Sequence, residues 1–248
     1  MRHIENFYTA SENIRGNQLE IRGDEFQHLV RVLRKKVRDI INVVDGEGNL
    51  YTVLLTEIKK NHATGEIQKK TRFLGESTFE LILAQPILRG NRFDLVIEKG
   101  TELGVNSFIP LKCEHAIIET SAARRQRWQK IAIAAMKQSG RSKLPEIQNP
   151  QTIKQVVTSA GLFYAGLIAH PSASGQMLSE LLFDIKKKNP MTKKALIIIG
   201  PEGGFSDQEV ELALEHGFKP FSLGPRRLRS ETAGIVAAAI IMEIFDAA

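Results

Sequence analysis

The chain of 248 residues lacks several features that define common classes of protein. Cys113 is its only cysteine, which excludes an internal disulfide and a cysteine cluster for a metal. No apolar run reaches the ~18 residues needed to span a membrane, and the N-terminus has no apolar stretch typical of a signal peptide. No spacing of His, Cys, Asp and Glu is typical of a metal site. We therefore expect a cytoplasmic protein with no membrane partner and no metal.

Two common nucleotide-binding motifs are also absent. The glycines of Gly200-Pro201-Glu202-Gly203-Gly204 do not have the G-x-G-x-x-G spacing, and no Gly-Lys-Ser/Thr follows them as in a P-loop. Pro201 removes one backbone N–H that a phosphate would need. A nicotinamide-dependent oxidoreductase is therefore disfavoured.

Positive charge is concentrated in two segments. The net charge is +6 and the isoelectric point is near 9.4. The acid-free segments are Val30–Arg38, with Arg31, Arg34, Lys35, Lys36 and Arg38, and Ala122–Lys143, with Arg124, Arg125, Arg127, Lys130, Lys137, Arg141 and Lys143. Such segments favour contacts with nucleic-acid phosphates, although two solvated faces would have the same composition.

The first 72 residues have the pattern of a small β-rich domain. Asp24 is in a position to cap a short helix. Strands are expected at Ile40–Val44, Leu50–Ile58 and Ala63–Lys69, with tight turns that suggest a small barrel. The polar segment Gln68–Ser77 reads as the linker to a second domain, residues 73–248.

From Phe79 onward, strands and helices alternate, which is typical of an α/β fold. Strands are expected at Leu81–Ala84, Ser107–Leu111, Leu162–Ala169, Ala195–Ile199 and Phe221–Leu223. Helices are expected at Arg92–Leu103, Ala122–Gln138, Asp207–His216 and from Ser230 or Glu231 to the end. The strand Ala195–Ile199 is apolar throughout, which predicts burial on both faces of a parallel sheet.

Two glycine-bearing turns follow two of these strands. Gly200–Gly204 follows a buried strand, and Leu223-Gly224-Pro225 follows the next one and precedes a dense run of arginines. Open α/β sheets bind ligands at the carboxyl ends of their strands. The turns therefore predict a small-ligand site beside a polyanion. Turns without a ligand, and arginines held in solvent, are the alternatives.

These motifs resemble those of the RsmE family, bacterial 16S ribosomal RNA uridine N3-methyltransferases of the SPOUT superfamily. The two signature segments are Gly200–Phe205 and Leu223–Ala233. Further matches are His28–Arg34, Glu98–Val105, Arg127–Trp128 and Gln138–Arg141. The resemblance covers nearly the whole chain, and the two C-terminal motifs are its most specific part.

The resemblance implies a PUA-like β-barrel followed by a SPOUT-type α/β domain with a C-terminal trefoil knot. It implies that S-adenosylmethionine binds in the knot and that two knotted domains pair as a homodimer through the last helix. The cofactor-binding residues implied are Ala169, Ile199, Gly200, Gly203, Leu223, Gly224 and Leu228. The implied substrate is 16S ribosomal RNA or the small ribosomal subunit.

Methylation of uridine N3 requires that the nitrogen lose its proton. Arg229 is the candidate to stabilise the resulting anion, and Glu202 and Glu231 are candidates to accept or orient the proton. A phosphate clamp is the alternative role for Arg229, and helix capping is the alternative for Glu231. The candidate RNA-binding residues are Arg31, Arg34, Lys35, Arg89, Arg92, Arg124, Arg125, Arg127 and Arg141.

Two positions depart from the family pattern. Arg227 stands where an aliphatic residue is usual, and Arg38 stands where glycine is common. Two other functions stay open: a non-catalytic RNA-binding or assembly protein, and a methyltransferase of the same fold that acts on another RNA.

Overall fold

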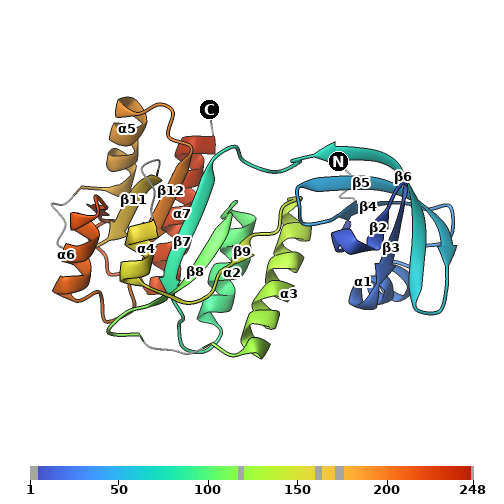
Figure 1. Ribbon diagram of the computed structural model, residues 1–248, viewed down its shortest axis with the longest axis horizontal. Coiled ribbons are helices and arrows are strands. Elements are labelled where there is room, and N and C mark those ends of the chain that lie inside the picture. Colours follow the sequence, from blue (N-terminus) through green and yellow to red (C-terminus); the bar gives the residue numbers. More distant parts are fainter. Residues whose placement is uncertain (1–4, 117–119, 160–163, 171–175, 247–248) are drawn as a thin grey trace. The chain divides into compact units, whose positions relative to one another are not determined.

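The chain divides into two compact units (Figure 1). A computed structural model describes residues 5–116, 120–159, 164–170 and 176–246. Unit 1 contains Met1–Glu76 and Ile133–Leu144, and unit 2 contains Ser77–Ala132 and Pro145–Ala248. Helix α3 (Ala122–Ser139) crosses the division, so its last turns belong to unit 1.

Unit 1 is built on a six-stranded sheet. Its strands are β1 (Asn6–Tyr8), β2 (Ile14–Arg15), β3 (Gln18–Arg22), β4 (Ile40–Val44), β5 (Asn49–Ile58) and β6 (His62–Arg72). They lie in the order β1-β4-β5-β6-β3-β2, and β1 runs parallel to β4 while the other pairs are antiparallel. Alternate residues of β5, Tyr51, Val53 and Leu55, point into one core because successive side chains of a strand face opposite sides.

Two predicted boundaries in unit 1 are wrong. Helix α1 (Gly23–Gln27) is preceded by Arg22, so Asp24 lies in the first turn instead of capping the helix; a single π-helical turn, His28–Val32, continues it. Strand β6 extends to Arg72, which pairs with Asn49, so the predicted linker begins with five residues of strand. This part of β6 pairs with β5, whereas β3 pairs with His62–Glu66, and Gln68, Lys69 and Lys70 are exposed.

Arg141 is buried in unit 1 and is 2% exposed. Its Nη2 donates to Glu76 Oε2 at 2.8 Å, and the backbone N–H groups of Ser142 and Lys143 donate to Glu76 Oε1, each at 2.8 Å. The guanidinium therefore holds the segment 140–144 against Glu76. This position removes Arg141 from the surface that could contact RNA, contrary to the prediction.

Unit 2 contains a parallel sheet. Its strands are β7 (Glu80–Pro86), β8 (Ser107–Lys112), β9 (Glu146–Ile147), β10 (Gln151–Thr152), β11 (Tyr164–Ala169), β12 (Lys194–Ile198) and β13 (Lys219–Phe221). The order is β10-β8-β7-β12-β11-β13, with β9 paired to β8. All of these pairs are parallel. Strand β12 lies between β7 and β11, so its apolar residues are buried as predicted.

Helices cover both faces of this sheet. They are α2 (Arg92–Glu102), α4 (Ile153–Ser159), α5 (Leu178–Lys188), α6 (Asp207–Glu215) and α7 (Ser230–Asp246). Helices α4 and α6 pack with Leu196 and Ile198 in one core. Helix α7 packs against α2, α5 and β7 (Figure 1). No helix among the described residues is both long enough and apolar enough to cross a membrane.

The ends of several elements differ from the predicted ones. Strand β13 ends at Phe221, so Leu223 lies beyond the sheet, and Ile199 lies one residue beyond β12. The first two residues of the predicted strand Leu162–Ala169 lie outside the described residues. The capping box of α6 is confirmed, because Ser206 Oγ accepts from Glu209 N–H and Glu209 Oε2 accepts from Ser206 N–H at 3.0 Å.

Candidate functional site

A cavity of about 360 Å³ lies at the carboxyl ends of β11, β12 and β13. Three segments that follow these strands form its walls, and the first turn of α7 closes it with Ser230 and Ala233. The lining contains all seven residues predicted to bind a cofactor: Ala169, Ile199, Gly200, Gly203, Leu223, Gly224 and Leu228. The parallel order of the strands explains why residues so far apart in sequence meet at one edge.

Two glycines in the lining are constrained, one by a close neighbour and one by its backbone conformation. A Cβ on Gly203 would lie 3.2 Å from His115 Cβ, so the turn packs closely against the loop after β8. Gly224 has a φ of 107°, in the region that favours glycine. These glycines leave backbone N–H and C=O groups close to the cavity, where a flat ligand can approach them.

A chain of hydrogen bonds fixes the junction of β7, β12 and α7. Gln85 Nε2 donates to Ser230 Oγ at 3.0 Å, and Ser230 Oγ donates to the carbonyl of Gly200 at 2.6 Å. A Cβ on Gly234 would lie 2.2 Å from Gln85 Oε1, so only glycine fits beside this side chain. The sequence pattern did not identify Gln85 as part of the site. The feature that could have identified it is a single amide side chain at the end of an apolar strand.

The predicted catalytic residues have different surroundings. Glu202 lines the cavity, but Arg229 and Glu231 do not. Arg229 is exposed on the segment that borders the cavity. Glu231 is only 7% exposed, and its Oε2 has no hydrogen-bond partner among the described residues. Its place in the first turn of α7 puts a negative charge near the positive end of the helix dipole.

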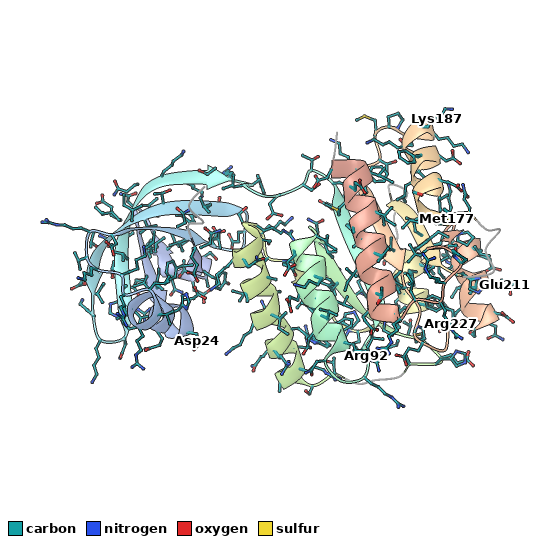
Figure 2. All side chains as sticks on the ribbon, turned by 180° about the vertical axis from the view of Figure 1, so that it is seen from behind. Asp24, Arg92, Met177, Lys187, Glu211 and Arg227 are labelled. Atoms are coloured by element: carbon teal, nitrogen blue, oxygen red, sulfur yellow. The ribbon has the colours of Figure 1, made fainter. Side chains whose placement is uncertain are left out.

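Glu202 is contacted by two arginines from different elements. Arg92, the first residue of α2, forms an ion pair with the Glu202 carboxylate. Arg227 Nη2 donates to the backbone carbonyl of Glu202 at 3.3 Å. Figure 2 shows Arg92 and Arg227 at the end of unit 2 where α7 begins. A predicted RNA-binding residue and a predicted catalytic residue thus contact each other.

The other predicted RNA-binding residues lie on both units. In unit 1, Arg31 and Arg34 are exposed and Lys35 is half-buried. In unit 2, Arg89 and Arg125 are exposed and Arg124 is half-buried; Arg125 Nη1 donates to Asn149 Oδ1. Arg127 Nε pairs with Asp94 Oδ2 at 2.8 Å.

Comparisons with known proteins show the family to which the chain belongs. The family of the RNA methyltransferase domain matches residues 75–242, and the RNA methyltransferase PUA domain matches residues 21–68. A ribosomal RNA small subunit methyltransferase E of Synechocystis is 33% identical over 90% of this chain and 72% of its own.

Two solved structures cover 98% of this chain and 98% of their own. One is a ribosomal RNA small subunit methyltransferase E from Neisseria gonorrhoeae bound to S-adenosyl methionine, with a TM-score of 0.86 and 31% identity. The other, a methyltransferase from Legionella pneumophila in complex with the same cofactor, has a TM-score of 0.84 and 32% identity. This chain therefore belongs to the ribosomal RNA small subunit methyltransferase E family of RNA methyltransferases.

Proposed function

We propose that this protein transfers the methyl group of S-adenosylmethionine to N3 of a uridine in 16S ribosomal RNA. The cavity at the ends of β11, β12 and β13 is the observation that carries this proposal, because its lining matches the residues implied by the family motifs. The lining fits the cofactor: Ile199, Leu223 and Leu228 supply apolar surface, and the glycine turns supply backbone groups for an adenosine.

Bound S-adenosylmethionine would supply an electrophilic methyl group on a positively charged sulfur. The protein would then hold the uridine unpaired, since N3 is on the Watson–Crick edge. Glu202 or Glu231 would accept or orient the N3 proton, and Arg229 would stabilise the negative charge of the deprotonated base. Positioning of the two reactants would supply much of the rate.

We also propose the two finer features of the fold. The C-terminal trefoil knot is supported by the sheet order, because β12 enters between β7 and β11 and the chain then passes from the edge strand β13 back to α7, which packs on β7 and α2. The PUA-like barrel is proposed for residues 1–72, and the methyltransferase domain for residues 73–248.

A homodimer is proposed through helix α7. One face of the helix is buried in the protomer through Ala238, Ile241 and Phe245. Ile235, Val236 and Ile240 on the remaining surface are only half-buried. An apolar helix of this kind is stabilised when a second copy covers it.

The proposed substrate is 16S ribosomal RNA, free or in the small ribosomal subunit, and the proposed place of action is the cytoplasm. Arg31, Arg34 and Lys35 of unit 1 and Arg89, Arg92, Arg124, Arg125 and Arg127 of unit 2 are the proposed phosphate contacts. These contacts position the RNA without reading its bases.

The test combines cofactor binding with methyl transfer. Calorimetric titration should show saturable binding of S-adenosylmethionine, and Gly203→Val should abolish it because the valine side chain would collide with His115 and displace the turn that lines the cavity. Small subunits from a strain lacking this activity should then gain one N3-methyluridine in 16S RNA, detected by mass spectrometry. RNA binding without cofactor binding would favour an assembly protein, and a methylated transfer RNA would favour another substrate.

A further inference from the structure

The ion pair between Arg92 and Glu202 is open to solvent. The side chains are 38% and 57% exposed, respectively. Exposed pairs of this kind add little to stability, because water solvates both partners well when they separate. Within the described part of the chain, the Glu202 carboxylate has no second partner that would hold it in place.

Asp94, the acid in the first turn of α2, differs from Glu202 in this respect. Asp94 accepts from Arg127 at 2.8 Å and from the buried Trp128 Nε1 at 3.0 Å, and its side chain is 14% exposed. Moving the Asp94 carboxylate would leave the indole N–H unpaired in the core, which is costly. Glu202 can leave its arginine at little cost, whereas Asp94 cannot.

Phosphate and carboxylate groups present similar oxygens to a guanidinium, and both form charge-assisted hydrogen bonds with it. Arg92 contacts the side chain of Glu202, and Arg227 contacts its backbone carbonyl, so both arginines contact one residue that lines the cavity. Figure 2 labels both arginines at this end of the unit. The Glu202 carboxylate therefore occupies the position beside Arg92 to which an anion of the substrate would be attracted.

We infer that Arg92 and Arg227 form a binding site for an RNA phosphate next to the target uridine, and that Glu202 occupies this site until RNA displaces it. The inference rests on the proposed function. It adds that the Glu202 carboxylate competes with the RNA phosphate for Arg92. Binding of the phosphate neutralises Arg92 and releases the Glu202 carboxylate beside the cavity that it lines. Arg227 also lines the cavity, so the site adjoins the proposed cofactor pocket.

The experiment measures the affinity of the full-length protein for a fluorescent single-stranded oligouridylate. Glu202→Gln should raise the affinity about threefold, because Arg92 no longer exchanges a weak surface partner for phosphate. The gain should disappear when Arg92→Gln is added. Arg227→Val should lower the affinity and reduce the slope of log K against log salt by about 0.7, the value of one phosphate on a single strand.

Glu211→Gln is the matched control, because Glu211 is an exposed acid of α6 that does not line the cavity. An equal gain in this variant, or a gain from Glu202→Gln that persists without Arg92, would show a general charge effect and overturn the inference. Titration of the wild-type protein with S-adenosylmethionine separates the two proposals. If the wild type binds the cofactor but Glu202→Gln gives no gain in RNA affinity that depends on Arg92, only the phosphate site is overturned. If the wild type does not bind the cofactor, the proposed function is overturned.

Discussion

At the residue scale, the backbone conformation at Arg38 affects the stability of unit 1. Arg38 has a φ of 77°, in the left-handed region, where glycine is the favoured residue. Its N–H donates to the carbonyl of Leu55 at 2.8 Å, so the hydrogen bond belongs to the backbone and does not need the arginine side chain. Position 38 therefore favours glycine, and this chain meets the required conformation with an arginine at some cost in strain.

Arg38→Gly is expected to raise the free energy of unfolding by about 1 kcal/mol. Relief of a left-handed side chain gains ~1–2 kcal/mol, and the added freedom of glycine in the unfolded chain removes part of it. Urea denaturation measures the change. Lys36→Gly is the control, because Lys36 has no positive φ. It should be destabilising, and a similar gain at both positions would contradict the explanation.

Cys113 is expected to be inert in the folded protein. Burial raises the pKa of its thiol to about 12, and the charge of Glu209 adds to this effect. Because the unfolded chain loses this proton near pH 9 while the folded chain keeps it, stability should fall as the pH rises from about 9 to about 12. A disulfide reagent at pH 8 should label the thiol only after denaturant is added. Rapid labelling of the native protein would show that the thiol is accessible.

At the scale of elements, the Glu76 carboxylate joins the end of unit 1's first segment to residues 141–143. It is 5% exposed and accepts from Arg141 and from two backbone N–H groups. Breaking a buried ion pair on one side leaves the other charge without compensation. Removal of the Glu76 carboxylate should therefore destabilise the fold by more than the intact ion pair stabilises it.

Glu76→Gln is expected to lower the free energy of unfolding by about 3–5 kcal/mol, because Arg141 stays buried and loses its ion pair with the Glu76 carboxylate. Chemical denaturation followed by far-ultraviolet circular dichroism measures the loss. Glu80→Gln is the matched control, since the Glu80–Lys194 pair is 42% and 39% exposed. Equal losses would mean that burial does not distinguish the two pairs.

Much of the second unit can be predicted from sequence because its strands are apolar runs between helices with clear end signals. The sequence pattern does not predict strands β1, β2 and β3 or helices α4 and α5. The three strands have two to five residues each, and β1 and β3 pair with strands far along the chain, β4 and β6. Periodicity carries no information about such pairing.

The candidate site can be predicted in part. The family motifs point to seven residues, all of which line the one cavity at the ends of β11, β12 and β13, and their roles stay predictions. Gln85, the burial of Arg141 and the Arg92–Glu202 pair do not follow from the sequence. Each of these features depends on contacts between side chains of different elements. The sequence of an arginine-rich segment does not show whether its side chains are in solvent or paired with a carboxylate.

At the scale of the whole molecule, the expected dimer can be tested on helix α7. Ile240 is half-buried in the protomer, so Ile240→Asp should introduce a charge into the proposed interface without entering the core. Light scattering should give a dimer for the wild type and a monomer for the variant, because a charge cannot be buried there without a partner. Glu243→Gln, at an exposed position of the same helix, should stay dimeric. A monomeric wild type would contradict the proposal.

The position of β12 between β7 and β11 has a consequence for the synthesis of the chain. Translation proceeds from the N-terminus, and domains begin to fold as they emerge. Unit 1's sheet and the strands β7, β8 and β11 leave the ribosome before β12, and both glycine turns and α7 follow β12. Nascent chains arrested before Gly200 should therefore not retain S-adenosylmethionine. The ability to bind the cofactor would arise abruptly, in the final moments of translation.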